Sequence, residues 1–188
     1  MKVFISGGCK NGKSTYAEKT AVRLSDKEGI LYYAATMIPA DREDEERIAR
    51  HRRQREGLGF KTVEIKRDIN RLADMCGVND TVLLDSVTAL LANEMFLPEG
   101  NIDEEAYKKI CAGLSELFLR VKNIVIVSDY IYSDGLAYDR LTEKYRSGLA
   151  EIDKFCAKAC DTVVEACCGN FIMYKGEGAL DEVPGKAV

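Results

Sequence analysis

The chain has 188 residues, of which 46% are hydrophobic and 31% are charged, and its formal net charge is −4. This length suits one domain with its own core, and the acidic balance argues against a nucleic acid partner bound over a broad basic surface. No stretch approaches the ~20 apolar residues that span a bilayer, and the first residues run directly into a glycine turn, so we expect a cytoplasmic protein.

Short apolar runs alternate with helical patterns along the chain. Strands are expected at residues 3–5, 30–35, 62–65, 81–85 and 124–128. Helices are expected at residues 13–26, 41–56, 69–76, 86–96, 103–121 and 139–160, followed by a hairpin at 162–166 and 171–174. This alternation predicts a three-layer α/β fold, a mostly parallel sheet with helices on both faces. We assign residues 1–175 to one domain and expect a flexible tail at 176–188.

The segment after the first strand matches the phosphate-binding pattern G-x-x-x-x-G-K-[ST]. Glycines let backbone amides curl around phosphate oxygens, and the helix that follows adds the positive end of its dipole. Lys13 is expected to reach the β- and γ-phosphates, and the Ser14 hydroxyl to bind Mg²⁺. The predicted nucleotide-binding loop comprises Gly7, Gly8, Cys9, Lys10, Asn11, Gly12, Lys13 and Ser14, with Thr15 directly after it.

Asp85 ends the apolar run Val82–Leu84, and a carboxylate in that place holds Mg²⁺ or its water from the side opposite Ser14. The alternative is that Asp85 or Ser86 caps the next helix. The seven cysteines include no CxxC pair, and the chain has one histidine. We therefore expect reduced thiols rather than disulfides or structural zinc.

The single histidine, His51, lies in an arginine-rich helical pattern. Arg47, His51 and Arg55 share one helix face. Arginines bind phosphate and push an imidazole toward its neutral form, and a neutral imidazole beside phosphate groups is able to attack phosphorus. The simpler interpretation is a solvated, salt-bridged surface helix with an incidental histidine, and composition alone favours it.

Five segments carry a resemblance to one known family. They are the loop Gly7–Ser14, Tyr33–Thr36, Arg47–Arg55, Leu83–Thr88 and the pair Arg140 and Arg146. Over roughly residues 2–175 the chain resembles the bifunctional adenosylcobinamide kinase/adenosylcobinamide-phosphate guanylyltransferases of cobalamin biosynthesis. The most specific segment is Arg47–Arg55, which reads Arg-Ile-x-x-His-x-x-x-Arg. The resemblance implies a RecA-like P-loop NTPase fold and a homotrimer.

The resemblance also implies two reactions on a corrinoid, with ATP and GTP as substrates and Mg²⁺ as the cofactor. In the first, ATP or GTP phosphorylates the aminopropanol hydroxyl of adenosylcobinamide. In the second, GTP gives its GMP to His51 and then to the phosphorylated acceptor, so that His51 and Lys13 are the implied catalytic residues. The further nucleotide contacts that it implies are Ala35, Thr36, Met37, Arg52, Arg53, Gln54, Arg55, Glu64 and Asp85.

Three places depart from the family pattern. Ser128–Tyr132 stands where the family has Thr-Asn-Glu-Val-Gly, Asp153-Lys154 where it has Asn-Gln, and Asn11 where it has Ser. The segments expected to bind the nucleotide therefore match the family, whereas the segments expected to bind the acceptor are altered. Two alternatives stay open: a P-loop kinase of another small metabolite, and a nucleotide-binding regulator without transfer activity. For the phosphoryl transfer, Asp85 and Asp129 are the candidate bases.

Overall fold

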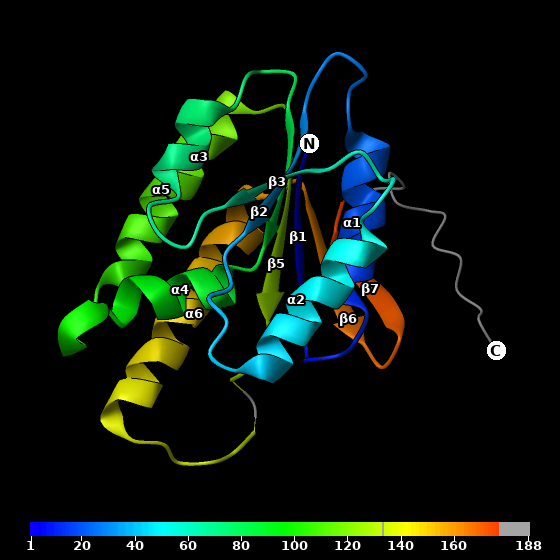
Figure 1. The fold of residues 1–188 in the computed structure, drawn as a ribbon. Helices are drawn as coiled ribbons and strands as arrows, with labels where there is room; N and C mark the ends of the chain where they lie inside the picture. Colours follow the sequence, from blue (N-terminus) through cyan, green and yellow to red (C-terminus); the bar gives the residue numbers. More distant parts are fainter. Residues whose placement is uncertain (133, 177–188) are drawn as a thin grey trace.

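A single seven-stranded sheet organises the protein (Figure 1). The computed structural model describes residues 1–132 and 134–176, so the predicted tail lies almost wholly outside the described residues. The sheet has the order β3-β2-β4-β5-β1-β6-β7, and all neighbouring strands are parallel except the hairpin β6–β7. The strands are β1 (Lys2–Gly7), β2 (Leu31–Ala35), β3 (Lys61–Glu64), β4 (Thr81–Asp85), β5 (Asn123–Asp129), β6 (Thr162–Cys167) and β7 (Asn170–Lys175).

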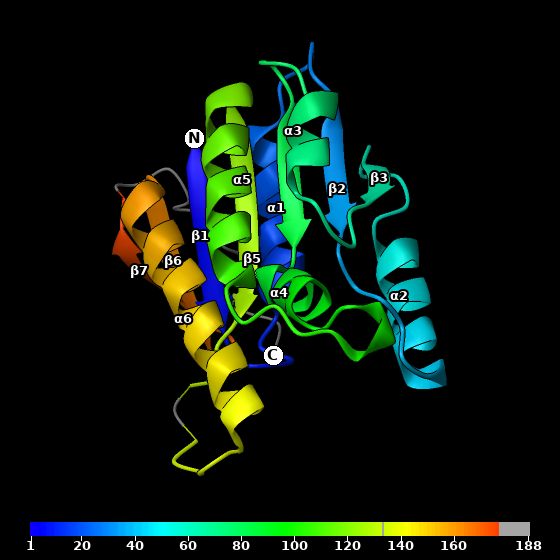
Figure 2. The same cartoon turned by 90° about the vertical axis from the view of Figure 1, so that its left-hand side faces the viewer.

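Helices cover both faces of the sheet, which confirms the predicted three layers. One face carries α1 (Lys13–Leu24), and the other carries α3 (Asn70–Met75), α4 (Val87–Met95), α5 (Ala106–Arg120) and α6 (Arg140–Ala159). Figure 2 shows that α2 (Arg42–Gln54) lies beyond the β3 edge of the sheet. Within the described residues, no helix has the length and apolar character that crossing a membrane requires.

Alternation along the central strands builds two separate cores. In β4, Val82 and Leu84 face the core beneath α3–α6, whereas Leu83 faces the core beneath α1, because successive strand side chains point to opposite faces. All three are completely buried, and each such side chain contributes roughly 1.5–3 kcal/mol of transfer free energy. The unbroken apolar runs predicted as parallel strands are therefore explained by burial on both faces.

The predicted boundaries agree with the structure to within a few residues, and the largest shift is the start of α5. The sequence pattern predicts a helix from residue 103, but α5 begins at Ala106. Phe96 pairs with Ile102 in an isolated bridge, and Asp103 N donates to Met95 O. These contacts hold the chain in a turn and delay the helix.

The strand register brings the candidate residues to one edge. Gly7 pairs with Asp129 on one side and with Ala166 on the other. Asp85 pairs with Ala35 of β2. The carboxyl ends of the parallel strands thus meet at the same edge, which is where ligands of such sheets bind.

Candidate active site

The phosphate loop is held tightly between β1, β6 and α1. A Cβ added to Gly7 would lie 2.3 Å from Ala166 O, so only glycine fits this close approach. Gly12 has a φ of +82° and α1 begins at the next residue, Lys13. Asn11 Nδ2 donates to Ala166 O over 3.4 Å, which means that the residue replacing the family's serine ties the loop to β6. The first amides of α1, which have no partner within the helix, begin at this loop.

Lys13 joins the loop to β5. Its buried Nζ donates to Gly8 O over 2.6 Å and forms a 2.9 Å ion pair with Asp129 Oδ1. In addition, Tyr130 N donates to Gly7 O over 2.9 Å. The predicted phosphate lysine and one of the two candidate bases are therefore neighbours, on the β5 side of the loop.

Asp85, the other candidate base and predicted metal ligand, belongs to a second group of residues. Tyr33 Oη donates to Asp85 Oδ2 over 2.9 Å. The Arg55 guanidinium lies 3.4 Å from the centre of the Tyr33 ring, and its Nη1 lies 3.6 Å from Glu18 Oε1. Burial raises the pKa of Tyr33, and the neighbouring Asp85 carboxylate raises it further, so the phenol remains a donor to Asp85.

This second group connects α2 to the site. Arg55 caps the end of α2, whereas Glu18 lies on α1 one turn after the phosphate loop. Burial raises the pKa of Glu18, while Arg55 counteracts that shift. Arg55 is itself buried; it binds an aromatic face and a carboxylate of its own chain, and is not directed to solvent like its neighbours Arg52, Arg53 and Gln54.

His51 lies one helical turn before Arg55 and is only partly exposed, although no side chain of α2 is fully buried. Burial lowers the pKa of His51, and Arg50, Arg55 and Arg47 act in the same direction. The Asp85 carboxylate opposes this shift, so the imidazole lies within electrostatic reach of the β4 end. These environments favour a neutral imidazole at pH 7, which is the nucleophilic form.

Thr36 and Ala35, two predicted nucleotide contacts, hold the β2 and β4 ends together. The Thr36 hydroxyl donates to Ser86 O and accepts from Ser86 N, both over 2.8 Å. Asn93 Nδ2 donates to Thr36 O over 2.7 Å. The Thr36 side chain is buried, and the preceding residue, Ala35, pairs with Asp85, so these contacts fix the β2 end against the residue that carries the Asp85 carboxylate.

Glu64 and Met37 lie farther from the phosphate loop. Glu64 ends the edge strand β3 and pairs with Lys66 over 3.0 Å. Four strand spacings separate β3 from β1 in the sheet order, which is about 19 Å. Met37 Sδ accepts from Arg47 Nη2 over 3.0 Å. The structure thus places these two predicted nucleotide contacts beside α2 and β3.

Beyond β5 the structure assembles a polar group to which the sequence patterns assign no role. Tyr132 Oη donates to Asp153 Oδ2 over 2.6 Å. Burial raises the pKa of Asp153 to about 6, against the smaller opposing effects of Tyr132 and Ser128. Ser128 Oγ and Asp153 Oδ1 are buried without a partner of good hydrogen-bond geometry. The only sequence signal for this group is that its positions depart from the family pattern.

A comparison with protein families matches residues 3–173 to the family described as "Cobinamide kinase / cobinamide phosphate guanyltransferase". The chain belongs to this family. Its curated relatives include the "Bifunctional adenosylcobalamin biosynthesis protein CobU" of Escherichia coli (strain K12), 27% identical over 87% of this chain and 93% of the relative. The protein of the same name from Salmonella typhimurium is 30% identical over 57% of each chain.

Among solved structures, one described as an "ATPase Domain" has a TM-score of 0.50 and is 13% identical, over 87% of this chain and 68% of that chain. This likeness supports the RecA-like P-loop fold that the resemblance implies. Family membership also makes the chain an enzyme with nucleotide substrates, whose phosphate loop has the expected setting between a strand and a helix.

Proposed function

We propose that the protein phosphorylates adenosylcobinamide with ATP or GTP and then transfers GMP from GTP to the product through His51. The observation that carries this proposal is that one sheet edge holds a phosphate loop flanked by two different acidic groups. Asp129 contacts Lys13, whereas Asp85 lies beside the α2 end that carries Arg55 and His51. The two transfers need different groups: a base for the acceptor hydroxyl, which the Asp129 side offers, and a nucleophile for the α-phosphorus, which the His51 side offers.

In the nucleotidyl step, His51 attacks the α-phosphorus of GTP. A bond forms between an imidazole nitrogen and phosphorus, the bond to the bridging oxygen breaks, and pyrophosphate leaves. The phosphate of the acceptor then attacks the same phosphorus and releases the imidazole. The lowered pKa of His51 supports this role because the attacking nitrogen needs its lone pair.

In the kinase step, the acceptor hydroxyl attacks the γ-phosphorus, the bond from that phosphorus to the bridging oxygen breaks, the nucleoside diphosphate leaves, and the hydroxyl proton passes to a carboxylate. Asp129 is the better placed of the two candidate bases, since it already contacts the lysine that is expected to hold the γ-phosphate. Asp85 instead accepts a hydrogen bond from Tyr33, which suits a group that holds a metal-bound water.

The residues present fit Mg²⁺. A serine hydroxyl and a carboxylate are oxygen ligands of the kind that Mg²⁺ prefers, and it takes its remaining ligands from phosphates and water. Ser14 would bind it directly and Asp85 through water, so that the ion neutralises charge on the phosphate chain. Among the described residues, no three His, Cys, Asp or Glu side chains cluster as a metal site, which is consistent with an ion bound together with the nucleotide.

The test is to incubate the enzyme with GTP labelled at the α- or the γ-phosphate and to analyse it by denaturing electrophoresis. We expect α-label to remain on the protein and γ-label to be lost, and His51→Ala to abolish retention. Glu45→Ala, an exposed substitution on the same helix α2, is the matched control for damage to the helix. Loss of label in neither or both variants would refute His51 as the acceptor.

A kinase without the nucleotidyl step is the second candidate, and the exposure of α2 favours it, since none of its side chains is fully buried. It predicts ADP formation with cobinamide and no protein-bound label. The homotrimer implied by the family resemblance also remains a proposal, and light scattering of the purified protein tests it.

A further inference from the structure

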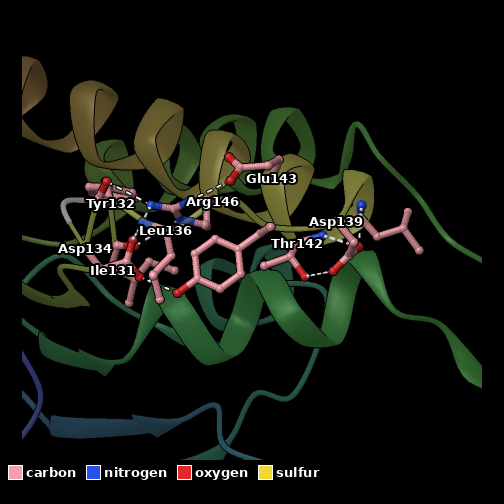
Figure 3. A network of polar contacts seen from close by, with 10 residues as sticks. Ile131, Tyr132, Asp134, Leu136, Asp139, Thr142, Glu143 and Arg146 are labelled. Atoms are coloured by element: carbon pink, nitrogen blue, oxygen red, sulfur yellow. Dashed lines mark hydrogen bonds and ion pairs between the residues drawn. The ribbon is translucent and has the colours of Figure 1, made fainter.

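A pocket opens beside the phosphate loop, between the segment after β5 and the first turns of α6. Its volume is about 530 Å³. The lining includes three tyrosines, Tyr130, Tyr138 and Tyr145, together with Ile131 and Arg146. Figure 3 shows Ile131, Asp134 and Arg146 gathered at one end of this region, and Thr142 nearer the start of α6.

Backbone and side-chain contacts fix the pocket next to the Lys13 side of the phosphate loop. Tyr130 N donates to Gly7 O over 2.9 Å, and the preceding residue, Asp129, pairs with Lys13. On the α6 side, Tyr145 Oη donates to Thr88 O over 2.9 Å, while Thr88 Oγ1 is 2.8 Å from Asp129 N, which donates to it. The pocket wall therefore begins one residue from the carboxylate that contacts the phosphate lysine.

The charged groups of the pocket are neutralised by one another. Arg146 Nε donates to Ile131 O over 3.1 Å, and its Nη2 donates to Tyr132 O over 2.9 Å. The same guanidinium pairs with Glu143 over 2.7 Å and with Asp134 over 3.2 Å (Figure 3). With these contacts made, Arg146 acts as a brace for the loop and is poorly suited to bind a further anion.

The aromatic side chains leave flat apolar surface on the pocket wall. The Tyr138 ring lies under Arg146, with the guanidinium carbon 4.6 Å from the ring centre, and its hydroxyl donates to Asp134. Tyr130 packs edge-on against Tyr132 at 5.2 Å between ring centres. Tyrosine faces of this kind bind uncharged, partly apolar groups, so the pocket is unlike the phosphate loop in what it recognises.

We propose that this pocket binds the uncharged arm of the acceptor that carries the reacting hydroxyl, and presents that hydroxyl to Asp129 and the γ-phosphate. This inference rests on the proposed kinase activity and places its second substrate. The new bond forms between the acceptor oxygen and the γ-phosphorus, the bond from γ-phosphorus to the bridging oxygen breaks, and the hydroxyl proton passes to Asp129. The nucleoside diphosphate leaves from the side of the γ-phosphorus opposite the attacking hydroxyl.

This placement keeps the site of phosphoryl transfer apart from the site of guanylylation. The acceptor arm lies on the β5–α6 side, whereas His51 and Arg55 lie on the β2–α2 side. A change in the pocket should therefore alter the use of cobinamide and leave self-guanylylation unchanged, since that step needs only GTP.

The test compares Tyr138→Ala with Tyr138→Phe, which keeps the ring, and with Tyr174→Ala, an exposed tyrosine on β7. Steady-state phosphorylation of adenosylcobinamide gives KM for both substrates, and α-labelled GTP gives guanylylation. For Tyr138→Ala we expect KM for adenosylcobinamide to rise at least about tenfold, as for loss of an aromatic anchor. The KM for nucleotide and the guanylylation level should stay within about twofold of the wild type, as should every parameter of Tyr174→Ala, and Tyr138→Phe should raise the KM for adenosylcobinamide less than Tyr138→Ala does.

The possible outcomes distinguish a wrong pocket assignment from a wrong kinase function. An unchanged KM for adenosylcobinamide in Tyr138→Ala, or an equal rise in the KM for nucleotide, overturns the pocket assignment while the activity stands. A wild-type enzyme that labels itself but neither binds nor phosphorylates adenosylcobinamide overturns the proposed kinase function, and the pocket assignment with it.

Discussion

Replacing Asp153 with asparagine tests the energetics of the buried group beyond β5. Burial raises the pKa of this carboxyl from 3.8 to about 6 in the folded protein. The folded state therefore binds the proton more tightly than the unfolded state, and the stability that this provides is full below pH 3.8 and lost as the pH rises through about 6. A difference of about two units is worth about 3 kcal/mol.

An asparagine at position 153 carries no charge at any pH, and its oxygen is able to accept the Tyr132 hydroxyl as Asp153 does. The new amide would also face the region of Ser128 Oγ, which has no partner of good geometry. We therefore expect Asp153→Asn to be about 1–3 kcal/mol more stable than the wild type at pH 8, and the difference to shrink to about a third of that value at pH 4.5. The substitution also introduces the residue type that the family resemblance implies at this place.

The assay is urea unfolding followed by circular dichroism at pH 4.5, 6 and 8. Asp74→Asn on the exposed surface of α3 is the matched control and should change the unfolding free energy by less than about 0.5 kcal/mol at each pH. If the variant is no more stable than the wild type at pH 8, or if its increase in unfolding free energy does not depend on pH, then burial does not raise the pKa of the Asp153 carboxyl.

Three further predictions concern the phosphate loop and the histidine. Lys13→Ala should weaken binding of a fluorescent GTP analogue at least about tenfold, because a charge-assisted contact to phosphate is lost; titration at constant Mg²⁺ measures this, and unchanged affinity would contradict the loop assignment. Gly7→Ala should lower the unfolding free energy by about 1–3 kcal/mol, because its Cβ would lie 2.3 Å from Ala166 O. Gly57→Ala, with φ of +83° and open space around the Cβ, should cost only about 1 kcal/mol in the same thermal unfolding experiment, and equal losses would refute the clash. Since burial and arginines lower the pKa of His51 from its usual value of 6.5, the loss of self-guanylylation on acidification should have its midpoint below pH 6.5; a midpoint above pH 6.5 would mean that the imidazole pKa is raised instead.

The phosphate loop is predictable because its chemistry is local. The anion site needs only Gly7 and Gly12, a lysine and a serine in fixed spacing, and the helical turn that follows them. The order of strands and helices is likewise predictable, since unbroken apolar runs and helical periodicity are visible in the amino-acid sequence. Within a few residues at each end, those patterns indicate the strands and helices that the structure contains.

The candidate site is predicted less completely, because most of its contacts join residues far apart in the chain. Arg55 is predicted to contact the nucleotide; the structure adds that it lies over the Tyr33 ring beside Glu18, and no spacing within α2 encodes that contact. Thr36 carries the same prediction, and its hydrogen bonds to Ser86 are likewise contacts that the sequence does not reveal. Asp153 and Tyr132, 21 positions apart, meet only because α6 packs beside the end of β5.

The sequence by itself determined the kind of ligand, a nucleoside triphosphate, and the alternation of strands with helices, since both depend on residues close together in the chain. Only the tertiary structure decided which acidic residue meets Lys13 and which meets Tyr33. That choice depends on strand order: β5, and not β4, lies next to β1, so Asp129 reaches the phosphate loop while Asp85 lies two strands away. Strand order results from how whole helices and strands pack around two cores, and such packing leaves no periodic trace in a single sequence.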